Sequence, residues 1–255
     1  MTSVSKASII LLMTDLTQRQ IKILKYIVEE FIETAAPVGS ENLEKKFNLG
    51  VSPATIRNEM SALVQLGYLK KEHTSSGRIP TSIGLKYYVR NLMASTNLPI
   101  TEEVKTKQKM WDYRTEFDKL IREAAKLLAQ KTRSMALVTT DQGGIFSCGS
   151  SNLLEEPEFY DIDVTKTVLS LIDDADYWLD IVKKADTIEH DQGIWLLIGE
   201  DLGLEHLETC GFVYQKYESG PHRGILGIVG PARFKYSQVV PLVDYLARLI
   251  SGISS

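Results

Sequence analysis

The chain has 255 residues, of which 44% are hydrophobic and 24% charged, enough for one large domain or two ordinary ones. Residues 15–90 carry 11 basic and 8 acidic side chains, whereas residues 135–215 carry 3 lysines and 17 acids, although the net charge of the chain is only -4. This asymmetry favours two domains, of which only the first would bind a polyanion, and no apolar run approaches the ~20 residues of a membrane span.

Residues 1–14 are predicted to be an N-terminal tail. The apolar run after Lys6 is not followed by a small-x-small cleavage site, so a signal peptide is not expected, and Met13 is an alternative start of the protein. Cys148 and Cys210 lie far apart without CxxC or metal-ligand spacing, which is typical of reduced thiols in a cytoplasmic protein.

The first domain is predicted at residues 15–96 and begins with a helix over residues 16–34. Thr17 and Gln20 match a T-x-x-Q capping box at the start of this helix, and apolar side chains then recur at helical spacing. A proline and a glycine break the chain after it. A short second helix follows, for which Ser40 is the expected N-cap.

A third helix is predicted over residues 53–66. Ser52 is a good N-cap, proline occupies the first helical position, and Gly67 can take the left-handed conformation that ends a helix. A β-hairpin over residues 68–81 and a fourth helix over residues 82–93 follow. Helices separated by a tight turn and followed by a hairpin make a winged helix-turn-helix domain.

Residues 97–133 are predicted to be a linker and a connecting helix, which becomes helical at about residue 104. Apolar positions between residues 110 and 131 alternate in steps of four and three, the spacing of a coiled-coil seam. This helix either lies across the sheet of its own domain or pairs between two subunits. Both interpretations fit a seam of this length.

The second domain, residues 134–255, is predicted to be an α+β sheet domain. Its mostly hairpin-linked strands and its helices resemble those of the GAF and PAS sensor class. The predicted strands are 135–140, 144–149, 194–199, 210–217 and 224–229, with helices at about 165–183 and from 237.

The third helix is the predicted DNA-reading element, because an α-helix fits the major groove and reads base edges near its N-terminus. Its start offers small residues, hydroxyl groups, an amide suited to adenine and an arginine suited to guanine or phosphate. The alternative is that the hydroxyls only cap the helix and the amide is merely exposed. The candidate DNA-binding residues here are Ser52, Pro53, Ala54, Thr55, Arg57 and Asn58, together with Ser40.

The hairpin is the predicted wing, and it concentrates hydrogen-bond donors and cations beside the helix. Lysine and arginine would neutralise phosphates, and Arg78 at a flexible glycine tip would reach the minor groove. A solvated charged hairpin is the alternative. The candidate DNA-binding residues in the wing are Lys70, Lys71, His73, Thr74, Ser75, Gly77 and Arg78.

Several motifs resemble those of the HrcA heat-inducible transcription repressors. The segments "APVGSENL", "VSPATIRNEMSALVQLGYLKKEHTSSGRIPT" and "LKYYVRNLM" are similar to the N-terminal winged-helix domain of that family. The segments "GSSNLLEEPEFYD", "IGED" and "GILGIVGPARFKYSQVVPLVDYL" are similar to its later parts. The resemblance therefore covers both ends and the middle of the chain.

The resemblance implies a homodimeric repressor of heat-shock chaperone operons that binds an inverted-repeat operator, CIRCE, and is kept active by the GroEL chaperonin. By matching position, residues 53–66 read DNA and residues 70–80 form the wing. Three departures stand out: Glu72-His73 in place of a proline before the histidine, Phe234-Lys235 in place of Met-Asp, and no counterpart of the inserted region that the family uses for dimerisation.

A different class of function is a winged-helix regulator whose acidic GAF-like domain senses a small molecule. No enzyme is predicted, because "GILGIVGP" lacks the G-x-G-x-x-G fingerprint and no serine stands in a G-x-S-x-G elbow. The acids of "LIDDADYWLD" fit a solvated helix face. No cofactor and no metal are therefore predicted.

Overall fold

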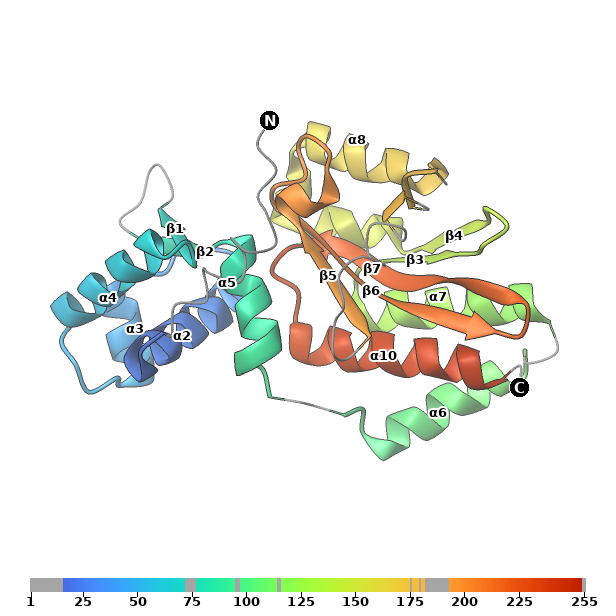
Figure 1. The fold of residues 1–255 in the computed structure, drawn as a ribbon, viewed down its shortest axis with the longest axis horizontal. Helices are drawn as coiled ribbons and strands as arrows, with labels where there is room; N and C mark the ends of the chain where they lie inside the picture. Colours follow the sequence, from blue (N-terminus) through green and yellow to red (C-terminus); the bar gives the residue numbers. More distant parts are fainter. Residues whose placement is uncertain are drawn as a thin grey trace. The chain divides into compact units, whose positions relative to one another are not determined.

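The computed structural model places the chain in two compact units, which divide between Met93 and Ala94 (Figure 1). The predicted tail lies outside the described residues. The structure describes residues 16–71, 77–94, 97–113, 116–174, 176–178, 180–181 and 193–253.

The first unit is a group of helices with a two-stranded antiparallel hairpin, which confirms the predicted winged helix-turn-helix (Figure 1). The last helix ends in a π-helical turn over Tyr88–Leu92. The elements are α2 (Gln18–Thr34), α3 (Ser40–Phe47), α4 (Pro53–Gln65), β1 (Leu69–Lys71), β2 (Arg78–Pro80) and α5 (Ser82–Tyr87).

The helix ends follow the local signals of the sequence at most positions. Thr17 and Gln20 form the predicted reciprocal capping box of α2, and the Ser52 hydroxyl accepts a hydrogen bond from the Thr55 amide at 3.2 Å. The prediction that Ser40 caps α3 is wrong. Gly39 already has the extended backbone of an N-cap, so Ser40 is the first residue inside the helix.

The core of the first unit lies between α2, α3 and α4, each of which buries one apolar face. Burying a side chain of this kind contributes about 1.5–3 kcal/mol. At the edge of the core, Arg19 of α2 forms an ion pair with Glu59 of α4 at 3.4 Å, which adds little because the arginine is exposed. The buried residues are Ile23, Leu24, Ile27, Val28, Leu43, Ile56, Met60 and Leu63.

The second unit is built on a five-stranded antiparallel sheet with strand order β4-β3-β7-β6-β5, which confirms the predicted α+β class. The chain thus returns to the middle of the sheet with its last strand. The strands are β3 (Met135–Thr139), β4 (Ile145–Cys148), β5 (Ile194–Ile198), β6 (Cys210–Ser219) and β7 (His222–Pro231).

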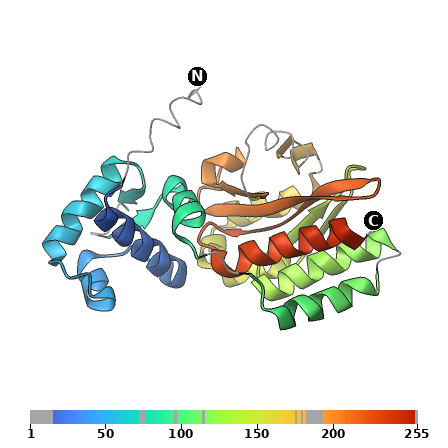
Figure 2. The ribbon, with the colours of Figure 1, turned by 60° about the horizontal axis from the view of Figure 1, so that its bottom comes forward.

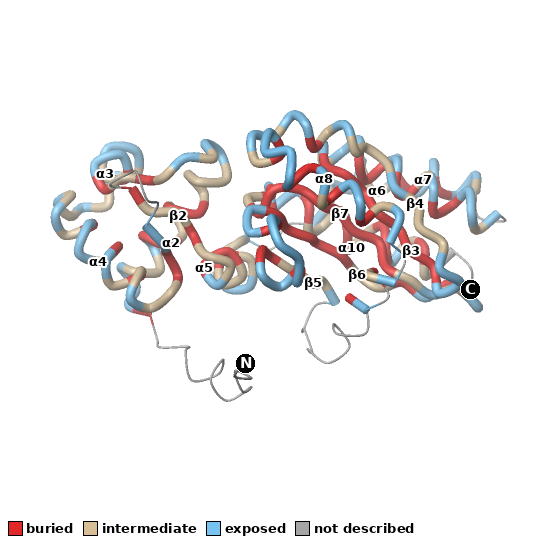
Figure 3. The backbone as a smooth tube through the Cα atoms, turned by 90° about the horizontal axis from the view of Figure 1, so that it is seen from above, coloured by how far each residue is buried: buried red, intermediate tan, exposed pale blue. Residues whose placement is uncertain are grey.

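Helices cover both faces of this sheet, and the central strands are the most deeply buried (Figures 2 and 3). One face carries α7 and α10, with α6 outside them (Figure 2). On the other face, Val168 of α8 joins a core cluster with Phe212 and Tyr214 of β6. These helices are α6 (Ile100–Trp111), α7 (Phe117–Thr132), α8 (Ile162–Ser170) and α10 (Tyr236–Ile253).

The predicted connecting helix is two helices, and the first starts at Ile100 rather than at about residue 104. The chain leaves α6 at Asp112 and re-enters a helix at Phe117. Helix α7 buries a long apolar face against its own sheet and α10. The interpretation that this segment lies across its own domain is therefore right for α7, whose coiled-coil-like spacing reflects packing within the unit.

The predicted helix at 165–183 is also interrupted. Helix α8 ends at Ser170, and a 3₁₀ turn over Leu171–Asp173 follows. The buried indole of Trp178 donates a hydrogen bond to the Leu171 carbonyl at 2.6 Å, so the break gives the tryptophan N–H a partner inside the core. Residues 182–192 lie outside the described residues.

Phe234, one of the departures from the family motif, occupies a glycine-lined surface on the sheet. Gly211 of β6 and Gly230 of β7 are register partners, and a Cβ built on either would lie 2.9 or 2.8 Å from the Phe234 ring. The ring therefore needs two residues without side chains beneath it. The adjacent Lys235 is exposed, so its replacement of an acid disturbs no core contact.

We expect Gly84→Ala to destabilise the first unit. A Cβ at this position of α5 would lie 2.2 Å from the carbonyl oxygen of Tyr68, which also accepts the Thr81 amide at 3.1 Å. Because backbone must move to admit the methyl group, the free energy of unfolding should fall by about 1–3 kcal/mol in denaturant titrations. Gly252→Ala is the matched control, since no atom lies within 4 Å of its added Cβ. Equal unfolding curves for the two variants would contradict this packing.

Candidate nucleic-acid interface

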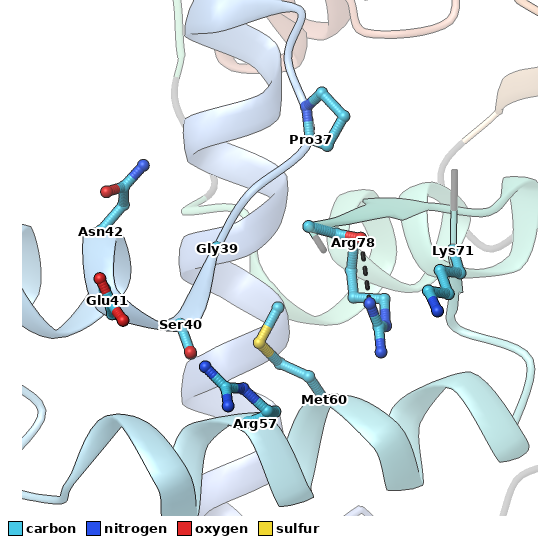
Figure 4. Close-up of a pocket in the computed structure, with 10 residues that line it drawn as sticks. Pro37, Gly39, Ser40, Glu41, Asn42, Arg57, Met60, Lys71 and Arg78 are labelled. Atoms are coloured by element: carbon cyan, nitrogen blue, oxygen red, sulfur yellow. Dashed lines mark hydrogen bonds between the residues drawn. The ribbon is translucent and has the colours of Figure 1, made fainter. Parts of the chain in front are cut away.

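A groove of about 590 Å³ opens in the first unit between the start of α3, helix α4 and the hairpin (Figure 4). Three of its side chains are cationic and come from different elements. The residues that line the groove are Pro37, Gly39, Ser40, Glu41, Asn42, Arg57, Met60, Lys71, Gly77 and Arg78.

Helix α4 has one buried and one exposed face, as the sequence predicts. Arg57 and Asn58 are exposed near its N-terminus, with Ala54 exposed one turn earlier. The hydroxyls of Ser52 and Thr55 lie 3.0 Å apart and share a hydrogen bond. The N-cap of α4 is therefore formed by Ser52. Arg57 and Asn58 are the long polar side chains that this end of the helix exposes.

The wing is a three-segment β-structure rather than a two-strand hairpin alone. In the hairpin, Lys71 pairs with Arg78 and Leu69 with Pro80. On the other side of β2, Val38 and Arg78 exchange two backbone hydrogen bonds of 2.9 and 3.0 Å. The loop between α2 and α3 is thereby fixed to the wing, and this contact brings α3 and β2 to the same groove.

Gly77 has a different role from the predicted one. It is buried rather than at a flexible tip, and a Cβ there would lie 2.7 Å from the Cβ of Pro37. Its lack of a side chain permits the close approach of the α2–α3 loop. Arg78 lies within β2, where its Nη1 donates to the Gly77 carbonyl at 3.1 Å. The predicted contacts His73, Thr74 and Ser75 lie outside the described residues.

Arg57, Lys71 and Arg78 therefore line one groove, and Glu41 is the acid among the described residues that line it. Converging cations in a concave surface raise the local concentration of an anion, and a phosphate backbone is a suitable ligand. Lys70 is exposed but is not among the lining residues, because adjacent side chains of a strand point to opposite faces.

Sequence reasoning missed the part of the groove that comes from Pro37, Gly39, Glu41, Asn42 and Met60. The segment "APVGSENL" carried the signal, because it stood out as a motif without an assigned contact role apart from its serine. Its position beside the wing depends on pairing between residues 40 positions apart, which local patterns do not reveal.

A metal site or a reactive thiol in the second unit would require particular side-chain groups. Within the described ranges, no group of three or more His, Cys, Asp or Glu side chains is placed to hold a metal ion, and no helix is long and apolar enough to cross a membrane. Cys148 and Cys210 are not bonded to one another. Burial raises the pKa of the Cys210 thiol to about 12, so the reactive thiolate is scarce at neutral pH.

Part-buried ion pairs hold segments of the second unit together instead. Arg233 donates from Nε to Glu158 at 2.6 Å and also pairs with Glu156. These acids belong to the "LLEEPEF" segment, and the arginine to the "GPARF" segment at the end of β7. The two motifs that resembled one family are therefore in direct contact.

Comparison with known proteins agrees with this architecture. A family model described as "HrcA protein C terminal domain" matches residues 100–240. A "Heat-inducible transcription repressor HrcA" of Carboxydothermus hydrogenoformans is 26% identical, covering 92% of this chain and 97% of the relative. One of Symbiobacterium thermophilum is 27% identical over 92% of this chain and 98% of the relative.

A crystal structure of a hypothetical protein has the same fold, with a TM-score of 0.72 at 20% identity, covering 94% of this chain and all of that one. The alignments with both repressors extend over 337 positions, more than the 255 residues of this chain. Each relative therefore contains residues without a counterpart here, in agreement with the expected lack of an inserted region. Because the family model spans more than half of the chain, and named repressors match nearly all of it, the protein belongs to the HrcA family.

Proposed function

We propose that the protein is a sequence-specific DNA-binding repressor of heat-shock chaperone operons that binds a CIRCE-type inverted repeat as a homodimer. The observation that carries this proposal is the groove in which Arg57, Lys71 and Arg78 converge beside the exposed N-terminal face of α4. The names of the relatives, which are heat-inducible transcription repressors, support it.

The geometry favours a division of labour within the interface. Exposed Arg57 and Asn58 on α4 are suited to base edges, since they lie where a recognition helix reads the major groove. Lys71 and Arg78 lie on the wing strands and are suited to phosphates, which fix orientation without carrying sequence information. Ser40 and the loop before it line the same groove. They would lie along the DNA sugar-phosphate backbone, between the base contacts of α4 and the phosphate contacts of the wing.

The two units would have different roles, one in DNA binding and one in regulation. The first domain, predicted as residues 15–96, binds DNA. The predicted connecting segment 97–133 belongs to the second unit through α6 and α7, and together with residues 134–255 it forms the regulatory domain of a cytoplasmic repressor. A GroEL-type chaperonin is the proposed partner, on the basis of family membership. With such a partner, the affinity of the protein for its operator should rise when the chaperonin is added. The alternative of small-molecule sensing requires instead a metabolite that raises the melting temperature.

Binding to an inverted-repeat duplex should exceed binding to a scrambled duplex of the same length and composition. Two half-sites engaged by a two-fold protein give repeat-dependent affinity, whereas phosphate contacts alone give binding that is equal on both duplexes and falls steeply with salt. A titration of the purified full chain at two salt concentrations measures both. Equal, salt-sensitive binding would contradict the operator assignment and leave only non-specific DNA binding.

Substitutions should separate base contacts from phosphate contacts. Arg57→Ala and Asn58→Ala should each lose about 1–3 kcal/mol of discrimination at particular base pairs. Lys71→Ala and Arg78→Ala should weaken binding to all sequences alike and reduce the salt slope by about one. Lys166→Ala, which removes an exposed charge from α8, is the control. A base-selective loss in Lys71→Ala would overturn the division.

A further inference from the structure

Helix α6 presents an apolar stripe to solvent. Ile100 is 78% exposed, Val104 49% and Trp111 47%, although large apolar side chains are usually buried. At 100° per residue these three positions fall within about 40° of one another, so they form one line along the helix. A shallow groove of about 700 Å³ runs along the same segment, lined by Val104, Gln108 and Trp111 among others.

A second face of α6, about 120° from the stripe, holds the helix to its own unit. Thr106 and Met110 are buried, the Tyr245 hydroxyl donates to the Glu103 carbonyl at 2.9 Å, and Lys131 forms an ion pair with Glu102 at 2.6 Å. Within the second unit, α6 is the outermost of the three helices on its side of the sheet (Figure 2). The stripe is therefore presented by a fixed helix and not by a loose segment.

The charges beside the stripe are arranged for an antiparallel copy of the same helix. Acids lie in the first turn and lysines in the second half of α6. If two copies pair about a two-fold axis at the helix centre, Ile100 faces Trp111 of the second copy. Glu103 and Lys107 lie on the same flank of the stripe, so each carboxylate meets the lysine of the other copy. The opposed helix dipoles also favour this orientation.

We propose that the exposed face of α6 is the surface through which two copies of this chain pair. The inference rests on the proposed two-fold repressor, and it assigns the pairing to a surface within a chain that is shorter than its relatives. A parallel arrangement would place acids against acids and lysines against lysines. Three large side chains on each side bury less than the ~800 Å² per partner of a standard interface, so the pair is a dissociable one.

Ile100→Asp tests the apolar stripe. The side chain is the most exposed in the stripe, and an acid at the first position of a helix favours helix formation, so loss of pairing would not reflect an unfolded helix. In sedimentation velocity of the full chain, this variant should dissociate at concentrations at which the native protein is dimeric. Lys166→Glu, which reverses an exposed charge on α8, is the charge-changing control and should leave the dimer intact.

A mixing experiment tests the antiparallel pairing itself. Glu103→Lys alone places four lysines together and Lys107→Glu alone four acids, so each homodimer should weaken by about tenfold. A mixture of the two variants restores both cross-pairs in the heterodimer, and its affinity should return to the native value. An effect confined to one helix cannot produce this recovery, because each chain of the mixture keeps its own like-charged pair.

The outcomes separate this inference from the proposed function. A native dimer that is insensitive to Ile100→Asp and shows no recovery on mixing would overturn the α6 surface and leave operator binding unaffected. A native protein that stays monomeric at micromolar concentration would also overturn it. Failure of repeat-dependent DNA binding, with the α6 results as expected, would overturn the repressor assignment alone.

Discussion

Two backbone hydrogen bonds between Val38 and Arg78 determine the shape of the candidate interface. They join the loop before α3 to the wing, and they require the wing to approach Pro37 so closely that Gly77 cannot carry a side chain. Without this contact, the start of α3 would not border the groove that α4 and the hairpin share. The cations at positions 57, 71 and 78 line the same groove as the start of α3, which the Val38–Arg78 contact holds beside the wing.

The second unit depends in a similar way on close approach. A cross-strand pair of glycines, Gly211 and Gly230, makes room for the Phe234 ring, and the neighbouring Arg233 binds acids from the segment after β4. The chain that follows β7 is thus fixed both by packing and by charge before α10 begins. Removing one partner of such a part-buried pair would leave a charge uncompensated, so these contacts maintain the arrangement of the unit.

The two units differ in the sign of the charge that they carry. The first unit places three cations, Arg57, Lys71 and Arg78, around one groove, whereas the second contains most of the acidic side chains. A polyanion would be attracted to the first unit and repelled by the second. The proposed inverted-repeat operator would require two copies in fixed relation, and the proposed pairing face of α6 would supply that relation in a chain that is shorter than its relatives.

The sequence by itself determined the features that depend on neighbouring residues. The capping box at Thr17, the cap at Ser52 and the left-handed Gly67 follow from local backbone requirements, and the strands of both units follow from alternation and turn residues. The family could be recognised for the same reason, since its motifs are short and contiguous. The exposed residues of α4 were also found, because a helix with one apolar stripe must present the opposite face to solvent.

Only the tertiary structure decided the rest. The division of one predicted helix into α6 and α7, the break after α8, the role of Gly77 and the contribution of Pro37 to the groove all depend on contacts between distant segments. Helical periodicity continues across a break when both parts bury apolar faces, so it cannot show where the chain bends. The groove is likewise invisible in sequence, because it exists only where Val38 meets Arg78.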